Sequence, residues 1–240
     1  MSDPKRAGRV LVAIDGPAGA GKSTAARRLA ERLDAFYLDT GAMYRACTLR
    51  AQRLGADLQD ATRLGEVVDG AEIELLPPPA GERNCRVLLD GEDVSEEIRS
   101  REVTSAIHHL ASCPAVRSRL VAQQQVIASK IERSVVAEGR DLASVVYPNA
   151  EVKIYLDATV EERARRRRRD LEQAGETPPA QAELEAEIAT RDRRDREREV
   201  GPLIQVPEAA LIDSSSMSLD EVVDAMAAEV ERAREAASPR

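Results

Sequence analysis

The chain has 240 residues, of which 42% are hydrophobic and 32% are charged, as in an ordinary water-soluble globular protein with one core and one or two small insertions. Its formal net charge of −8 would repel a polyanion, and its 2% of aromatic residues are too few for a surface that stacks nucleic-acid bases. We therefore expect no nucleic-acid partner, and any phosphate site must come from local clusters of arginine.

The predicted strands of the core are short apolar runs. In chain order they cover residues 10–14, 36–38, 134–137, 152–156 and 210–212. Continuous apolar runs of this length are typical of strands buried on both faces of a parallel sheet. Helices are predicted to begin near Ser23, Thr159 and Ser218, and the last two positions open capping boxes. Strands that alternate with helices predict an α/β fold with a five-stranded parallel sheet.

Two stretches interrupt this alternation. The first, residues 61–110, holds the segments Glu72-Ile73-Glu74-Leu75 and Arg86-Val87-Leu88-Leu89, with Pro77-Pro78-Pro79 between them and Asp90-Gly91 after them. Asp-Gly is a strong hairpin signal, so this stretch predicts a small antiparallel insertion. The second, from about residue 160 to 198, is helical and rich in arginine, with a break at residues 175–179.

The segment after the first predicted strand matches the pattern G-x-x-x-x-G-K-[ST] in full. Its residues are Gly16, Pro17, Ala18, Gly19, Ala20, Gly21, Lys22 and Ser23, followed by Thr24. Glycines let backbone N–H groups surround phosphates, and the start of the next helix adds its positive dipole end. Lys22 would reach the β- and γ-phosphates, and the Ser23 hydroxyl would coordinate Mg²⁺. With a strand before it and a helix after it, the motif predicts a nucleoside-triphosphate site rather than a chance glycine-rich turn.

A triphosphate site alone is compatible with kinases, GTPases, motor ATPases and non-catalytic binders. The chain has no N-K-x-D motif for guanine, which disfavours a GTPase. It also lacks an acidic residue that closes a long apolar strand, the Mg²⁺ ligand of many ATPases.

Further segments are more specific than the loop. They are residues 38–45, 114–117 and 138–141, and the helix that carries Arg191, Asp195 and Arg198. On a helix these three side chains lie within about 60° of one another, so they share one face. The other side, with Asp192, Arg193, Arg196 and Glu197, is predicted to be an ordinary solvated face.

Together these segments resemble the bacterial cytidylate kinases, which phosphorylate CMP and dCMP with ATP. The similarity extends from Val10 to about Ser216 and includes residues 90–95. It implies a three-layer α/β/α core of residues 9–60, 111–158 and 199–235, a monophosphate-binding insertion of residues 61–110 and an arginine-rich lid of residues 159–198. It also implies ATP as phosphoryl donor, Mg²⁺ and a monomeric chain.

The resemblance further assigns side chains to each substrate. Those expected to bind the acceptor nucleotide are Arg45, Arg140 and Arg198 at its phosphate, Arg117 and Asp141 at its cytosine, and Thr40, Arg191 and Asp195 towards its sugar. Asp39 is also expected among the substrate-binding residues. The lid candidates for the transferring phosphoryl group are Arg163, Arg166 and Arg167. Transfer to a monophosphate needs no strong base, because its phosphate is already ionised near neutral pH, so clustered arginines and Mg²⁺ supply the catalysis.

One position departs from the family pattern. Family members usually carry serine nine residues before the arginine of the Pro-x-Val-Arg segment, where this chain has His108. Either the substitution is tolerated on a partly exposed helix, or His108 bonds the cytosine edge and makes base recognition sensitive to pH. Its neighbour His109 is predicted to point away by about 100°, so that the pair forms no metal site.

Two other functions remain possible. One is a small-molecule hydroxyl kinase in which Asp39 acts as base. The other is a regulatory ATPase that binds nucleic acid through the arginine run 165–169, although the net charge and the few aromatics disfavour it. That run goes right round a helix, so most of it should pair with acidic neighbours such as Glu162.

The cysteines Cys47, Cys85 and Cys113 have neither metal-ligand nor redox spacing and predict free thiols in a reducing compartment. We find no apolar run long enough for a signal peptide or a membrane span. The expected location is the cytoplasm, without a membrane partner.

Overall fold

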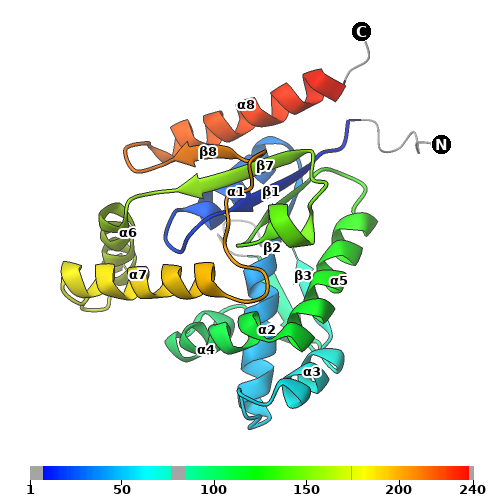
Figure 1. The fold of residues 1–240 in the computed structure, drawn as a ribbon, viewed down its shortest axis with the longest axis vertical. Helices are drawn as coiled ribbons and strands as arrows, with labels where there is room; N and C mark the ends of the chain where they lie inside the picture. The colour runs from blue at the N-terminus through cyan, green and yellow to red at the C-terminus, as the bar shows by residue number, and fades with distance from the viewer. Residues whose placement is uncertain (1–7, 77–84, 174, 238–240) are drawn as a thin grey trace. The chain divides into compact units, whose positions relative to one another are not determined.

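The computed structural model describes residues 8–76, 85–173 and 175–237 (Figure 1). Its larger sheet has the strand order β2-β6-β1-β7-β8, and a smaller sheet has the order β3-β4-β5. The strands of the larger sheet are β1 Leu11–Asp15, β2 Phe36–Asp39, β6 Val135–Glu138, β7 Val152–Asp157 and β8 Ala210–Asp213. These are the five predicted strands, and the α/β fold class with a five-stranded parallel sheet is confirmed.

The chain forms two compact units, one of residues 1–35 and 133–240 and the other of residues 36–132. The second unit is longer than the insertion of residues 61–110 that the sequence predicts. It also contains α2 (Thr40–Arg53) and α5 (Pro114–Lys130), because both helices share a hydrophobic core with the insertion.

The first unit is built around β1, which lies between β6 and β7 with Ile14 opposite both Glu138 and Ile154. Its helices are α1 Lys22–Arg32, the π-helix η3 Leu142–Val146, α6 Val160–Gln173, α7 Gln181–Glu197 and α8 Leu219–Ala237. The predicted box at α8 is complete, because the backbone N–H of Ser218 donates to Glu221 at 2.8 Å and that of Glu221 donates to the Ser218 hydroxyl at 3.3 Å. At α6, the backbone N–H of Glu162 donates to the Thr159 hydroxyl at 3.3 Å.

The second unit carries the predicted antiparallel strands, β3 Ile73–Leu76, β4 Arg86–Leu89 and β5 Glu92–Asp93. Between β4 and β5, Asp90 and Gly91 have φ values of 54° and 82°, the positive values that a two-residue hairpin turn requires. The three prolines at 77–79 lie outside the described residues. The Asp-Gly prediction is therefore confirmed, at the residues where the chain has to reverse.

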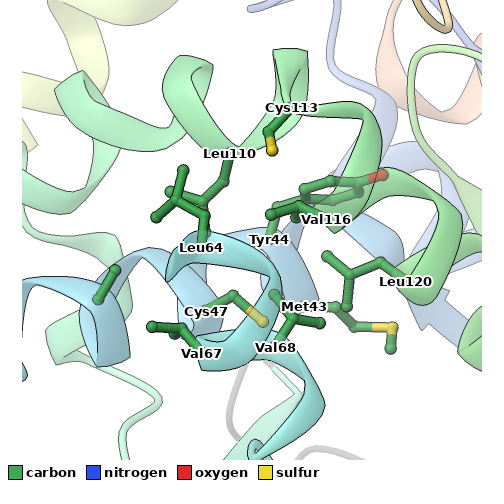
Figure 2. Packing of buried hydrophobic residues seen from close by; sticks show 11 residues of the cluster. Met43, Tyr44, Cys47, Leu64, Val67, Val68, Leu110, Cys113, Val116 and Leu120 are labelled. Carbon is green, nitrogen blue, oxygen red and sulfur yellow. The ribbon is translucent and has the colours of Figure 1, made fainter. Parts of the chain in front are cut away.

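Helices supply most of the core of the second unit (Figure 2). Besides α2 and α5 they are α3 Ala61–Asp69, η2 Glu97–Arg99 and α4 Arg101–Ser112. Met43 and Cys47 of α2 pack with Leu64 of α3, Leu110 of α4 and Leu120 of α5, all buried. The three cysteines are free thiols in the structure; all three are also buried and belong to this unit.

A search of the described residues for a helix long and apolar enough to span a bilayer finds none.

Candidate active site

The predicted phosphate-binding loop joins the end of β1 to the start of α1. Gly16, Gly19 and Gly21 have φ values of 149°, 78° and 88°, which residues other than glycine rarely adopt. A Cβ at Gly16 would lie 2.0 Å from the carbonyl oxygen of Leu156 in β7, so this position also needs glycine for close packing. Ser23 and Thr24 are exposed in the first turn of α1, where a ligand can reach them.

Lys22 is nearly buried, at 5% exposure, and its Nζ donates to the carbonyl oxygen of Pro17 at 2.7 Å. Burial, and after it the charge of Arg140, lower the pKa of Lys22 far below the usual value for lysine, although Glu138 and Asp15 act in the opposite direction. The positive charge of the Lys22 ammonium group is therefore only partly balanced by nearby carboxylates, and a bound polyphosphate would balance it.

Asp15, the last residue of β1, was not predicted as a site residue. Its two carboxylate oxygens accept hydrogen bonds from the backbone N–H groups of Leu142 and Ala143, each at 2.8 Å. Burial raises the pKa of Asp15 to about 6, even though both N–H donors act to lower it. The carboxylate thus ties the end of β1 to the start of η3, directly after Arg140 and Asp141. The sequence carries no local signal for partners that lie 127 and 128 residues away.

Predicted site residues of the first unit do converge on Asp195. Arg140 donates to its carboxylate through Nε at 3.0 Å, and Nη2 of Arg198 lies 3.8 Å from the other oxygen. Burial would raise the pKa of Asp195, but the charges of Arg140, Arg198 and Arg191 together hold it below its usual value. Arg198 caps the end of α7 rather than continuing it, yet it still reaches Asp195. Asp141, which follows Arg140 in the sequence, is buried.

The three lid arginines differ in their surroundings. Arg163 is 2% exposed, and its guanidinium donates to the carbonyl oxygens of Ala158 and Ala18 at 2.9 and 3.0 Å and to Asp192 at 2.6 Å. Arg166 is half-buried and donates to the carbonyl oxygens of Ala20 and Ser214 at 3.1 and 2.6 Å. Arg167 is exposed. Arg167 is therefore the most exposed of the three.

Asp192 corrects one prediction. It was assigned to a solvated face of α7, but it is 3% exposed and pairs with Arg163. The assignment was wrong because α6 packs against α7 through Ala164, Leu171, Leu184 and Ile188, so that two sides of α7 are covered. Within the arginine run, Glu162 pairs with Arg165, Arg166 and Arg169, as the charge pattern indicated.

In the second unit, Asp39 organises the start of α2. One carboxylate oxygen accepts from the backbone N–H of Ala42 at 2.8 Å, and the other accepts from Arg45 at 2.8 Å and lies 3.9 Å from Nη2 of Arg99. A Cβ at Gly41 would lie 3.2 Å from Nη1 of Arg45, so the guanidinium lies across this glycine. Arg99 was missed by sequence reasoning, because only η2 brings it to Asp39. Thr40 is buried next to Asp39.

Two of the residues predicted at the base, Arg117 and His108, lie in the same unit, whereas Asp141 belongs to the first unit. Arg117 is 2% exposed, donates to the carbonyl oxygen of Ala111 at 3.3 Å and lies 6.0 Å above the centre of the Tyr44 ring. Nδ1 of His108 lies 2.7 Å from the carbonyl oxygen of Ser105. A carbonyl can only accept, so Nδ1 carries the proton and Nε2 is the acceptor of the neutral ring.

The prediction that His109 points away from His108 was wrong, because the two ring centres are 4.0 Å apart. Adjacent helical positions diverge by about 100° at Cβ, but two long side chains can turn back towards each other.

Comparison with known proteins gives a family and several relatives. The family model described as cytidylate kinase matches residues 12–232. A cytidylate kinase of Geobacillus kaustophilus is 49% identical over 216 residues, which are 90% of this chain and 94% of that protein. A bifunctional pantoate ligase/cytidylate kinase of Synechococcus sp. is 48% identical over 216 residues, and the matched part is 44% of that protein. The chain thus spans less than half the length of the bifunctional relatives. A solved gluconokinase from Sinorhizobium meliloti is 16% identical, covers 96% of each chain and gives a TM-score of 0.46.

Proposed function

Because this chain belongs to the cytidylate kinase family, we propose that it transfers the γ-phosphoryl group of ATP to CMP or dCMP, giving ADP and CDP or dCDP. The observation that carries the proposal is the complete phosphate-binding loop within a family match that covers residues 12–232. The loop supports the use of a triphosphate donor, and the family supports the cytidine monophosphate acceptor.

On the donor side, the backbone N–H groups of residues 16–23 and the positive end of α1 bind the phosphates. Lys22 breaks its hydrogen bond to the Pro17 carbonyl and donates to the β- and γ-phosphates instead. Its partner then changes from a neutral carbonyl to anionic oxygens. Ser23 is suited to be a Mg²⁺ ligand, because its residue is exposed next to Lys22 at the start of α1 and its hydroxyl supplies an oxygen, the ligand atom that Mg²⁺ prefers. Bound there, Mg²⁺ would neutralise charge on the β- and γ-phosphates.

On the acceptor side, Arg45 binds the monophosphate. Its partner Asp39 holds the guanidinium across Gly41, so the group is oriented before the substrate arrives. The alternative role of Asp39, as the base of a hydroxyl kinase, is disfavoured because its carboxylate already accepts from Ala42 and Arg45 and is 7% exposed. We assign Arg117 and His108 to the base.

The remaining site residues stabilise charge during transfer. Arg140, Arg191 and Arg198, arranged around Asp195, are assigned to the substrates, and the exposed Arg167 is assigned to the transferring phosphoryl group. No residue has to remove a proton, because the acceptor phosphate has a second pKa near 6 and is anionic at neutral pH. The reaction is then an in-line displacement in which arginine and lysine charges offset the repulsion between two anions.

The test is an assay of ADP release with purified protein, ATP and Mg²⁺ across CMP, dCMP, UMP, AMP, GMP and a panel of hydroxyl acceptors. We expect CMP and dCMP to be used best and Lys22→Ala to lose most of the turnover. Phosphorylation of a hydroxyl compound with no use of any nucleoside monophosphate would refute the proposal, and normal turnover by Lys22→Ala would refute the role of the loop.

We further propose that the protein is a monomer and that it is located in the cytoplasm. The free, buried thiols support a reducing compartment. Light scattering during gel filtration, with and without nucleotide, measures the molar mass of the eluting protein and so tests whether it is a monomer.

A further inference from the structure

Three carbonyl groups of the phosphate-binding loop accept hydrogen bonds from cationic side chains. Lys22 donates to Pro17, Arg163 to Ala18 and Arg166 to Ala20, at 2.7, 3.0 and 3.1 Å. The two arginines belong to α6, which follows the loop by more than 130 residues. They also pack against its glycines, since a Cβ at Gly19 would lie 3.2 Å from Cβ of Arg163 and one at Gly21 would lie 3.4 Å from Nη1 of Arg166.

These carbonyls control the direction of the donors that bind phosphate. A trans peptide group is planar, and its C=O and N–H point in opposite directions. Fixing the carbonyl of Ala18 therefore fixes the N–H of Gly19, and fixing that of Ala20 fixes the N–H of Gly21. A cation on the carbonyl also polarises the peptide and strengthens its N–H as a donor. The two arginines thus act on phosphate binding from behind the loop.

Arg163 is itself held in place. Its three guanidinium nitrogens donate to Ala158, Ala18 and Asp192, and both members of the ion pair are at most 4% exposed. Removing either partner would leave a buried charge uncompensated. The guanidinium therefore stays behind the loop, whereas Lys22 needs to break one bond to a carbonyl to reach a phosphate.

We propose that Arg163 and Asp192 are positioning residues, which orient the loop N–H groups towards the phosphates of ATP, and that Arg163 does not touch the transferring phosphoryl group. The inference rests on the proposed function in so far as the loop binds ATP. It replaces the catalytic role that the sequence predicted for Arg163, and it gives a role to Asp192, for which the sequence predicted none.

Asp192→Asn separates the two explanations because they predict opposite signs. If Arg163 and Asp192 acted on phosphates only through their charges, removing the negative charge of Asp192 would leave ATP binding unchanged or tighten it. If Asp192 positions Arg163, the variant should bind ATP more weakly, by about tenfold and at most about 10²-fold. Calorimetric titration of Mg·ATP gives the Kd, and steady-state assays give KM for CMP, which we expect to stay near the wild-type value.

Two further variants complete the design. Arg163→Met combined with Asp192→Leu removes both charges, so it leaves no unpaired buried ion, and circular dichroism without nucleotide checks that it is folded. It should bind ATP as weakly as Asp192→Asn. Arg168→Ala is the control, because Arg168 lies on the same helix but pairs with Glu172 at the surface, and this variant should bind ATP normally.

A folded double variant with wild-type ATP affinity would overturn the inference, as would Asp192→Asn with unchanged or tighter binding. Arg163→Lys that lost kcat without any change in Kd for ATP would also overturn it, since that result is expected of a group on the transferring phosphoryl. Failure of the wild-type protein to bind ATP would instead refute the proposed function.

Discussion

At the scale of single residues, Arg45 is the clearest acceptor ligand. We predict that Arg45→Ala raises KM for CMP by about 10- to 100-fold, because a charge-assisted hydrogen bond contributes about 1.5–3 kcal/mol. Its Kd for ATP should change little, since the loop lies elsewhere in the chain. Steady-state kinetics and ATP titration measure the two effects. Arg53→Ala is the control, as Arg53 is on the same helix and pairs with Glu92 and Glu97. Equal losses towards both substrates would contradict the assignment.

His108 gives a prediction about base selectivity. With its proton on Nδ1, the ring offers Nε2 as an acceptor, which matches the exocyclic amino group of cytosine but not the O4 of uracil. We predict that His108→Ala lowers the ratio of kcat/KM for CMP over UMP in steady-state assays.

His109→Ala should retain the wild-type ratio. An unchanged ratio in His108→Ala would favour the other interpretation, that histidine is tolerated at this position without contacting the base.

The lowered pKa of Lys22 predicts that the protein takes up a proton when it binds ATP. Burial and Arg140 lower its pKa in the free protein, and bound polyphosphate must raise it again, because it adds negative charge. Where binding takes up a proton, affinity decreases as pH rises. Between about pH 8 and 9.5, where the ATP phosphates are fully ionised, we expect the Kd for ATP to increase. Calorimetry in two buffers of different ionisation enthalpy measures the proton directly, and Lys22→Arg should show no uptake.

At the scale of elements, the approach of the loop to β7 depends on Gly16. Gly16→Ala places a Cβ 2.0 Å from the Leu156 carbonyl oxygen, so β1 and β7 must separate or the loop must move. We expect a loss of more than about 2 kcal/mol of stability in urea unfolding followed by circular dichroism. Gly175 also has a positive φ, of 76°, but a Cβ there would meet nothing within 4 Å, so Gly175→Ala should cost only about 1 kcal/mol. Similar midpoints for the two variants would contradict the packing argument.

Elements were predictable where the signal is local. The apolar run 10–14 became β1, the Asp90-Gly91 turn became a hairpin, and the Ser218 box begins α8. Predictions that depend on which side of a helix is covered were less secure. Asp192 was assigned to solvent because nothing in the sequence indicates that α6 packs there. Likewise, Arg99 and Asp15 meet their partners only through tertiary structure.

At the scale of the whole molecule, the two compact units contain different groups of site residues. We predict that Mg·ATP alone slows hydrogen exchange in residues 16–25, because loop N–H groups bind phosphate there. CMP alone should slow exchange in residues 39–45 and 108–117. Mass spectrometry of peptides from both units measures this. Protection of residues 39–45 and 108–117 by ATP but not by CMP would contradict the assignment of the acceptor.

The buried cysteines have a practical consequence. Cys47, Cys85 and Cys113 are 0%, 3% and 7% exposed, and all three lie in residues 36–132. A thiol-specific label can therefore react only when that unit opens, and burial also raises the pKa of Cys47 and Cys85, so that the reactive thiolate is scarce. The rate at which the unmodified protein is labelled therefore measures how often this unit opens. No cysteine has to be introduced, and opening of the other unit does not contribute to the rate, because that unit contains no cysteine.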